Sequence, residues 1–157
     1  MNRVEIHAEE VPLPSWSTSL RSYALKVLSA LGRDKWILSV LLCGDKTIQT
    51  LNSRYRGKDE ATDVLSFSSG ESDGFPQASR SGAYLPGDIV ISLDSLRENA
   101  RCLGISEDEE LRRLLIHGIL HLDGMDHRSN KDSEPMLQLQ EHILEDLAGE
   151  TILGRNV

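Results

Sequence analysis

The chain has 157 residues, of which 39% are hydrophobic and 27% charged, with a formal net charge of −8 at pH 7. This length and composition are typical of one globular domain with its own core, so we expect residues 1–157 to fold as a single compact domain. The acidic balance excludes a protein that coats nucleic acid through a broad basic surface, because Lys and Arg must neutralise the phosphates, and any such contact must use a local basic pocket.

The first half of the chain is predicted to alternate strands with helices. Segments with alternating or continuous apolar residues are expected to be strands: residues 3–7, 36–43 and 62–67. Between the first two, apolar residues at helical spacing predict an amphipathic helix from Trp16 to Gly32. Asp45 is placed to cap a second, short helix, whose end carries a group of cations: Arg54, Arg56 and Lys58.

A polar segment divides the chain in the middle. Residues 68–82 are rich in Ser and Gly and predict a mobile loop. Residues 87–92 then have the continuous apolar character of a short buried strand. Ser92 is expected to cap the helix that follows, and Gly104 is placed to end it.

The last third of the chain is predicted to be helical. Ser106 and Glu109 have the spacing of a capping box, in which each side chain bonds to the backbone amide of the other residue. The helix that they open is apolar around most of its circumference, so we expect it to be the buried central helix. A final amphipathic helix is expected over residues 130–147.

Three histidines of the central helix and the turn after it are candidate metal ligands. His117 and His121 are four residues apart, so their side chains lie about 40° apart on one helix face and can bind one ion. Gly124 is placed to end the helix, because glycine adopts left-handed backbone angles without a Cβ penalty, and His127 can then return as third ligand. The sequence thus predicts one divalent ion. Zinc suits imidazole ligands, although nickel or another first-row ion also accepts them.

The same histidine spacing occurs in metzincin proteases. Those enzymes place a glutamate directly after the first histidine as general base, whereas this chain has Gly118 there. Three imidazoles leave the ion an open position that can bind and acidify water, and Asp123 and Asp126 are candidates to orient the rings or transfer protons. Hydrogen-bonded core histidines without metal, and a purely structural metal, stay open as alternatives.

The cysteines and the apolar runs of the sequence indicate in which cellular compartment the protein is found. Cys43 and Cys102 lack CxxC spacing, which favours reduced thiols in a reducing environment. The start of the chain has no basic segment followed by an apolar one, and no apolar run approaches the roughly 20 residues that cross a bilayer. We therefore expect a cytoplasmic protein with no membrane partner.

Five segments of the chain match one family pattern in the same order: residues 51–52, 55–59, 62–67, 87–91 and 117–127. The last, His-Gly-Ile-Leu-His-Leu-Asp-Gly-Met-Asp-His, is similar to the pattern H-G-x-L-H-L-x-G-x-D-H. In combination these segments resemble the YbeY family of metal-dependent endoribonucleases. One departure is Ser68, since the family commonly continues with proline after the segment that ends at residue 67.

The resemblance implies an α+β fold, with a mixed and mostly parallel sheet of about four strands packed with helices around the central histidine-bearing helix. It also implies that His117, His121 and His127 hold the metal ion. The part of the chain that carries the resemblance, residues 37–148, includes both the basic segment and the histidines. The basic segment then gains a function that its composition alone does not indicate.

The resemblance implies that Arg56 is the functional arginine of the family. A guanidinium offers a planar fork of donors to phosphate oxygens, so Arg56 is expected to bind the scissile phosphodiester and to act in catalysis. Lys58 is expected to assist in substrate binding, and Asp126 is the further candidate catalytic residue. The nucleophile is left open between water activated by the metal and the 2′-hydroxyl of the RNA.

The function implied is a zinc-dependent endoribonuclease specific for single strands, acting in 3′-end maturation of small-subunit (16S) rRNA and in ribosome quality control. Its implied partners are single-stranded or ribosomal RNA and the small ribosomal subunit with its associated proteins. Two alternatives stay open. One is a metallohydrolase on another substrate such as a peptide, against which the missing glutamate at position 118 counts. The other is a ribosome-associated binding module in which the metal mainly stabilises the fold.

Overall fold

A four-stranded sheet forms the centre of the computed structural model, which describes residues 1–69 and 82–154. Its strands are β1 (Arg3–Ala8), β2 (Ile37–Cys43), β3 (Val64–Ser68) and β4 (Gly87–Ser92). They lie in the order β1-β2-β4-β3, with β1, β2 and β4 parallel and β3 antiparallel to β4 at one edge. The mixed, mostly parallel sheet and the α+β class are therefore confirmed.

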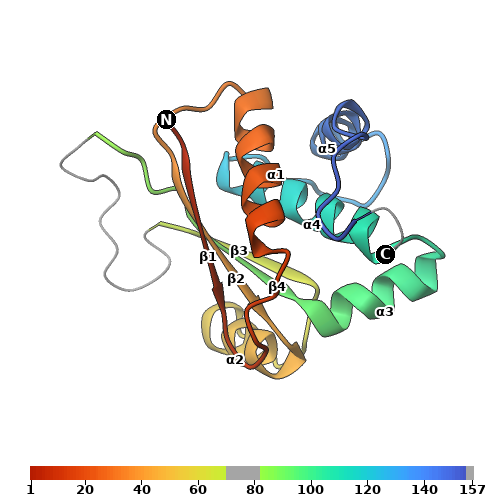
Figure 1. Cartoon of the computed structure of the whole chain (residues 1–157). Helices are drawn as coiled ribbons and strands as arrows, with labels where there is room; N and C mark the ends of the chain where they lie inside the picture. Colours follow the sequence, from red (N-terminus) through yellow and green to blue (C-terminus); the bar gives the residue numbers. More distant parts are fainter. Residues whose placement is uncertain (70–81, 155–157) are drawn as a thin grey trace.

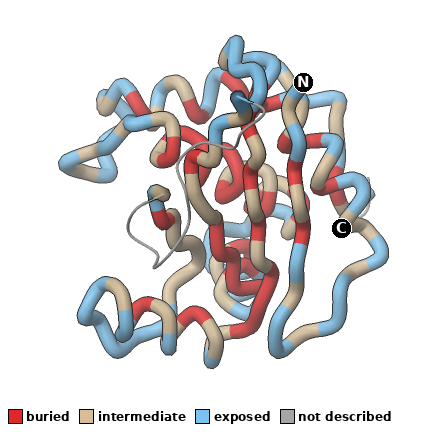
Figure 2. Tube along the Cα trace, turned by 90° about the vertical axis from the view of Figure 1, so that its left-hand side faces the viewer, coloured by how far each residue is buried: buried red, intermediate tan, exposed pale blue. Residues whose placement is uncertain are grey.

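Helices cover both faces of this sheet (Figure 1). In the described part of the chain they are α1 (Ser17–Ala30), α2 (Asp45–Arg56), α3 (Leu93–Leu103), α4 (Glu107–Leu122) and α5 (Pro135–Asp146). The larger apolar cluster joins α1, α4 and α5 to one sheet face through Leu38, Val40 and Ile89. The smaller cluster buries Ile48 of α2 against Phe67 on the other face. Buried residues accordingly follow the strands and the inner helix faces (Figure 2).

Helix α4 is the buried central helix that the sequence predicts. It contacts β3, β4, α1, α3 and α5, and most of its apolar residues are buried. At Gly118 the helix lies directly on the sheet, because a Cβ built there would be only 2.9 Å from Cγ2 of Ile89. The Ser66 hydroxyl of β3 donates to the Gly118 carbonyl at 3.3 Å. This close approach places the last turn of α4 beside the edge strand.

The start of α2 differs from the prediction. Asp45 is the first helical residue and does not cap the helix with its side chain. Its Oδ1 accepts hydrogen bonds from the hydroxyls of Ser92 and Ser95, both at 2.6 Å. The Thr47 amide is instead satisfied by the carboxylate of Glu10 at 2.8 Å. A carboxylate brought in by the tertiary structure thus takes the cap, which leaves Asp45 to join α2 to the start of α3.

The two C-terminal helices also begin differently from the prediction. Ser106 accepts from the Glu109 amide at 3.0 Å, as a capping box requires, but the Glu109 carboxylate binds Arg113 at 3.1 Å instead of returning to the cap. The expected helix over residues 130–147 begins only at Pro135. Proline favours the first helical position and disfavours helical angles in the residue before it, so the helix starts there.

Residues 70–81 lie outside the described part of the chain, and with them most of the segment 68–82 that the sequence predicts to be a mobile loop. Among the described residues, no helix has the length and apolar character to cross a bilayer. Both cysteines are free thiols. Burial raises the pKa of Cys43 to about 12, so that residue stays a protonated, inert thiol, whereas Cys102 is exposed.

Candidate active site

Three imidazoles meet at the C-terminal end of α4. One ligand atom from each of His117, His121 and His127 lies within 4.8 Å of the others, and all three residues are half-buried. The Nε2 atoms of His117 and His121 are 3.1 Å apart. The described structure thus brings the predicted triad together, close enough to hold one metal ion.

The chain reverses immediately after α4 to bring the third histidine back. The helix ends at Leu122, and Gly124 has a left-handed φ of 93°. The amide of Met125 donates to the Leu120 carbonyl at 3.0 Å, which closes the turn. This confirms the predicted role of Gly124, because a residue with a Cβ would be strained at that angle. His127 follows three residues later, and its ring centre lies 5.2 Å from that of His117.

Each ring is oriented by a contact on its outer side. Nδ1 of His117 lies 2.6 Å from Oε1 of Gln140 on α5, and Nδ1 of His127 lies 2.9 Å from the Ser129 carbonyl. His121 forms a hydrogen bond with the Met125 backbone. With the outer nitrogens engaged, the inner nitrogens face one another across the cluster.

The electrostatics of the cluster favour neutral rings. Burial lowers the pKa of His117, an effect opposed by the Gln140 hydrogen bond, and burial together with the neighbouring His117 lowers the pKa of His121. Neutral imidazole is the form that binds metal. Two nitrogens about 2.1 Å from one tetrahedral zinc ion are roughly 3.4 Å apart, close to the 3.1 Å between the His117 and His121 atoms. The donor set and its spacing therefore fit a divalent ion.

The two aspartates between His121 and His127 have different surroundings. Asp123, expected to orient a ring or transfer a proton, is bound by Arg33 at 2.8 Å and 2.9 Å. Asp126 lines the cavity beside the histidines and accepts a hydrogen bond from the His127 amide at 2.8 Å. Of the two, Asp126 is therefore the one placed to face a substrate.

A cavity of about 420 Å³ joins the histidines to the edge of the sheet. Its walls come from α2, β3, the end of α4 and the turn after it, and its lining residues are Arg56, Val64, Leu65, Ser66, Ser68, His117, His121, Gly124, Met125 and Asp126. The structure thus brings Arg56, Asp126, His117 and His121 to one cavity, and His127 lies beside the other two histidines. Lys58, the other predicted substrate ligand, is exposed beyond the end of α2 and is not among the lining residues.

Arg56 reaches the cavity from the last turn of α2. Its Nη2 donates to the Ser66 carbonyl at 2.5 Å, and its guanidinium lies 5.3 Å from the centre of the Phe67 ring. Both partners belong to the edge strand β3. The arginine is therefore held by the strand that forms one wall of the cavity, with a hydrogen bond and a cation–π contact fixing its direction.

Two contributors to the site are missed by sequence reasoning. Gln140 orients His117 from α5, and Ser66 holds Arg56 through its backbone carbonyl. A signal for Gln140 exists in the sequence: it stands on the same helix face as Met136 and Ile143, which are apolar and buried. A polar residue within a buried apolar stripe indicates a hydrogen-bonded role. No pattern could indicate the Ser66 carbonyl, since every residue has one.

The position where metzincins carry their glutamate faces the sheet and not the cavity. The contact between Gly118 and Ile89 leaves no room for a side chain on this side of α4. Gly118 is also absent from the cavity lining. A general base cannot be supplied from this position, which removes the protease arrangement from the site.

Comparisons with known proteins show which family the chain is similar to. The family described as Endoribonuclease YbeY matches residues 4–148. The chain is 43% identical to an Endoribonuclease YbeY of Treponema pallidum over 92% of this chain and 89% of the relative. It is 42% identical to one of Aquifex aeolicus over 82% of each. The solution structure of TM1509 from Thermotoga maritima is similar with a TM-score of 0.62 and 29% identity, covering 94% of this chain and 90% of that one.

Proposed function

This chain belongs to the Endoribonuclease YbeY family, and from that premise we propose that it cleaves single-stranded RNA with one divalent metal ion held by His117, His121 and His127. Zinc is the ion we expect. Residues 1–157 would act as one metallo-endoribonuclease domain. The observation that carries the proposal is the cavity of about 420 Å³ that joins His117 and His121 of this triad to Arg56.

The cavity suits a phosphodiester because Arg56 lines it and the adjacent histidine triad could hold a divalent cation. When bound, a divalent ion would polarise a phosphoryl oxygen and lower the pKa of a coordinated water. Arg56 would bind the remaining phosphate oxygens with its fork of N–H donors, which are already aimed by the Ser66 carbonyl. Charge that develops on the phosphate in the transition state would then meet donors that need no reorganisation.

We propose that Asp126 accepts the proton that the attacking hydroxyl group loses. One of its oxygens is bound by the His127 amide, and the other is available to accept a proton within the cavity. A carboxylate at this place can act as general base for water or for the 2′-hydroxyl of the RNA. Lys58 is exposed and lies outside the cavity lining. Its ammonium group could bind a phosphate that flanks the scissile one.

Single-stranded RNA suits the charge distribution. The net charge of −8 disfavours a long electrostatic contact along a duplex, whereas a flexible strand can insert one phosphate into a local pocket. From the resemblance stated above we further propose 3′-end maturation of 16S rRNA and ribosome quality control as the cellular role. That role includes contact with the small ribosomal subunit and its proteins, and a cytoplasmic location.

Cleavage of a fluorescent single-stranded RNA tests the proposal. We expect metal-loaded wild-type protein to cut it, and both His121→Ala and Arg56→Ala to lose at least about 100-fold in rate. Metal content, measured by atomic absorption, should fall in His121→Ala and stay at the wild-type level in Arg56→Ala. An RNA carrying the 3′ extension of the small-subunit precursor, cut at a defined bond, would support the proposed cellular role.

Two matched variants serve as controls. His142 is an exposed histidine of α5 that pairs with Asp146, and Arg54 is an exposed arginine of α2 stacked on Tyr55. We expect His142→Ala and Arg54→Ala to cleave at the wild-type rate. Equal cleavage by all five proteins would identify a contaminating nuclease. Retained ribosome binding by a protein that cuts no RNA would favour a binding module with a structural metal.

A further inference from the structure

Gln140 is a buried polar residue on the face of α5 that packs against α4. It is 6% exposed, and its Oε1 lies 2.6 Å from Nδ1 of His117. Its neighbours on this helix face, Met136, Ile143 and Leu144, are apolar and buried. A buried amide is unfavourable unless it is hydrogen-bonded, so its partners decide how the amide is oriented.

The orientation of the Gln140 amide is determined by Glu141. The amide nitrogen donates to Glu141 Oε2 at 3.1 Å. Arg113 binds the same carboxylate with two hydrogen bonds of 3.0 Å, and this contact lowers the pKa of Glu141. An ionised carboxylate only accepts hydrogen bonds. The NH₂ group must therefore face Glu141, and the oxygen of the amide must face His117.

The oxygen of an amide also only accepts, so Nδ1 of His117 must carry the hydrogen. The lone pair then resides on Nε2, which is the atom 3.1 Å from Nε2 of His121 in the centre of the triad. We propose that Gln140 is a positioning residue which, held by the Glu141–Arg113 ion pair, fixes His117 as the Nδ1-protonated tautomer with Nε2 directed at the metal. This inference rests on the metal site of the proposed function.

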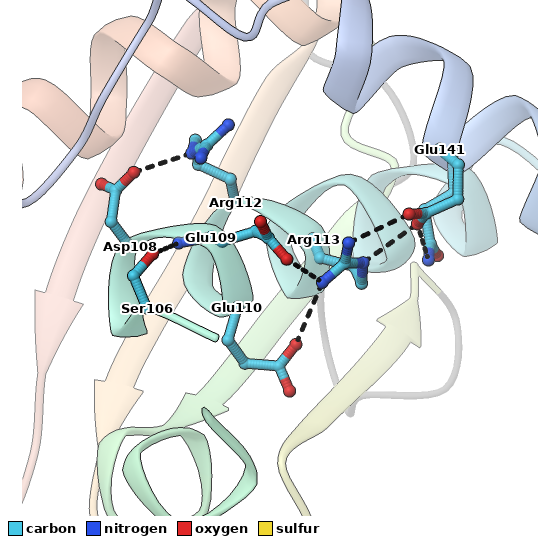
Figure 3. A network of polar contacts seen from close by, with 8 residues as sticks. Ser106, Asp108, Glu109, Glu110, Arg112, Arg113 and Glu141 are labelled. Atoms are coloured by element: carbon cyan, nitrogen blue, oxygen red, sulfur yellow. Dashed lines mark hydrogen bonds and ion pairs between the residues drawn. The ribbon is translucent and has the colours of Figure 1, made fainter. Parts of the chain in front are cut away.

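The arginine of this ion pair is itself held on α4. Figure 3 shows Arg113 between Glu109 and Glu110 on its own helix and Glu141 on α5. Nη1 of Arg113 lies 3.1 Å from Oε2 of Glu109 and 4.0 Å from Oε1 of Glu110. The network thus runs from Glu109 in the first turn of α4, through Arg113 and the Glu141–Gln140 pair of α5, to the predicted metal ligand His117 near the end of α4. The docking of α5 and the affinity for metal are therefore coupled.

His127 and His121 are oriented locally. Their partners, the Ser129 carbonyl and the Met125 backbone, lie two and four residues away in the chain. Gln140 is 23 residues from His117. Loss of the α5 contact should therefore free one ligand while the other two keep their orientation, and metal affinity should weaken without being abolished.

The test compares Gln140→Met with wild type in two measurements that need no RNA. Competition with a chromophoric zinc chelator should show affinity weaker by about 10–100-fold, as is typical when a group that orients a metal-binding histidine is lost. Histidine ¹⁵N correlation spectra of the metal-free protein should show the Nδ1-protonated form of His117 in wild type and a mixture of tautomers in the variant.

Gln138→Met is the matched control, since Gln138 is an exposed glutamine of the same helix, and it should behave as wild type in both measurements. Glu141→Gln is the second variant. It keeps Gln140 and its packing but replaces the carboxylate with an amide that can both donate and accept. We expect the same tautomer mixture and a smaller loss of affinity, about 3–10-fold.

Unchanged affinity and an unchanged His117 tautomer in Gln140→Met would overturn the proposal. If Gln140→Met does not fold, as judged by circular dichroism, Glu141→Gln decides it by the same two measurements. A weaker affinity with an unchanged tautomer would point to packing alone and would also overturn it. Because RNA is absent throughout, a protein that shows both effects but cleaves no RNA would refute the proposed function and leave the positioning role intact.

Discussion

The two walls of the cavity are built in opposite ways. The histidine wall comes from residues 117–127, and each of its rings is fixed by a contact on its outer side. The arginine wall joins Arg56 of α2 to the edge strand β3, and Arg56 is an exposed residue that lines the cavity. The histidine wall therefore comes from one continuous stretch of chain. The other depends on the packing of two elements on a sheet edge, and it carries the group that meets the phosphate.

Removing the metal should have the largest effect, and it should act on the histidine wall alone. A chelator that strips the ion is expected to abolish cleavage and to lower Tm, because an ion that binds only the folded state stabilises it by mass action. Arg56→Ala should show the same fall in Tm, since its metal site is intact. A smaller fall in Arg56→Ala would show that the two walls are not independent.

Arg56→Lys tests the arginine wall at constant charge. Lysine cannot form the two-pronged contact with phosphate or retain the same hold on the Ser66 carbonyl. We expect kcat to fall by about 10–100-fold, with metal content and Tm unchanged. Steady-state cleavage kinetics measure this. A kcat equal to wild type would mean that charge alone, and not the fork, is what this wall supplies.

Gly118→Ala separates α4 from the sheet and so strains both walls at once. The added methyl group would lie 2.9 Å from Ile89, and overpacking of this kind costs about 1–3 kcal/mol of unfolding free energy. Urea denaturation of the metal-free protein should show this loss. Gly149→Ala is the control, because a Cβ there meets no atom within 4 Å. If both variants match wild type, α4 does not rest on the sheet as described.

The smallest effect concerns Glu110, a buried acid in the first turn of α4, the helix whose other end carries His117 and His121. Burial, and then the charge of Asp63 just before β3, raise the pKa of Glu110 above 4.5. The stability linked to its protonated form is complete below about pH 4.5 and is lost as the pH rises through the raised value. Glu110→Gln should therefore be more stable than wild type near neutral pH.

That advantage should shrink as the pH falls through the raised pKa of Glu110, because the folded wild-type residue takes up its proton there. Thermal denaturation of both proteins across this pH range measures the difference. A difference that is constant with pH would arise from the ion pair with Arg113, whose side chain is 4.0 Å away, and not from the buried charge.

Much of the fold follows from local patterns in the chain. The strand over residues 87–92, the cap at Ser92 and the helix end at Gly104 are all found where the sequence predicts them. The errors, at Asp45, at Glu109 and at the start of α5, are at helix ends, where several polar side chains compete for the same amides. At the start of α2 the carboxylate that accepts from the Thr47 amide belongs to Glu10, which no pattern near residue 45 could reveal.

In the candidate site, too, local features follow from the sequence and long-range contacts do not. The sequence by itself determines the histidine wall, because residues four apart share a helix face and a glycine can reverse the chain to return His127. Only the tertiary structure decides the rest. It brings Arg56 across the edge strand, places Gln140 behind His117 and closes the space beside Gly118. These contacts join residues distant in the chain, and spacing along a sequence contains no information about which helix will pack against which strand.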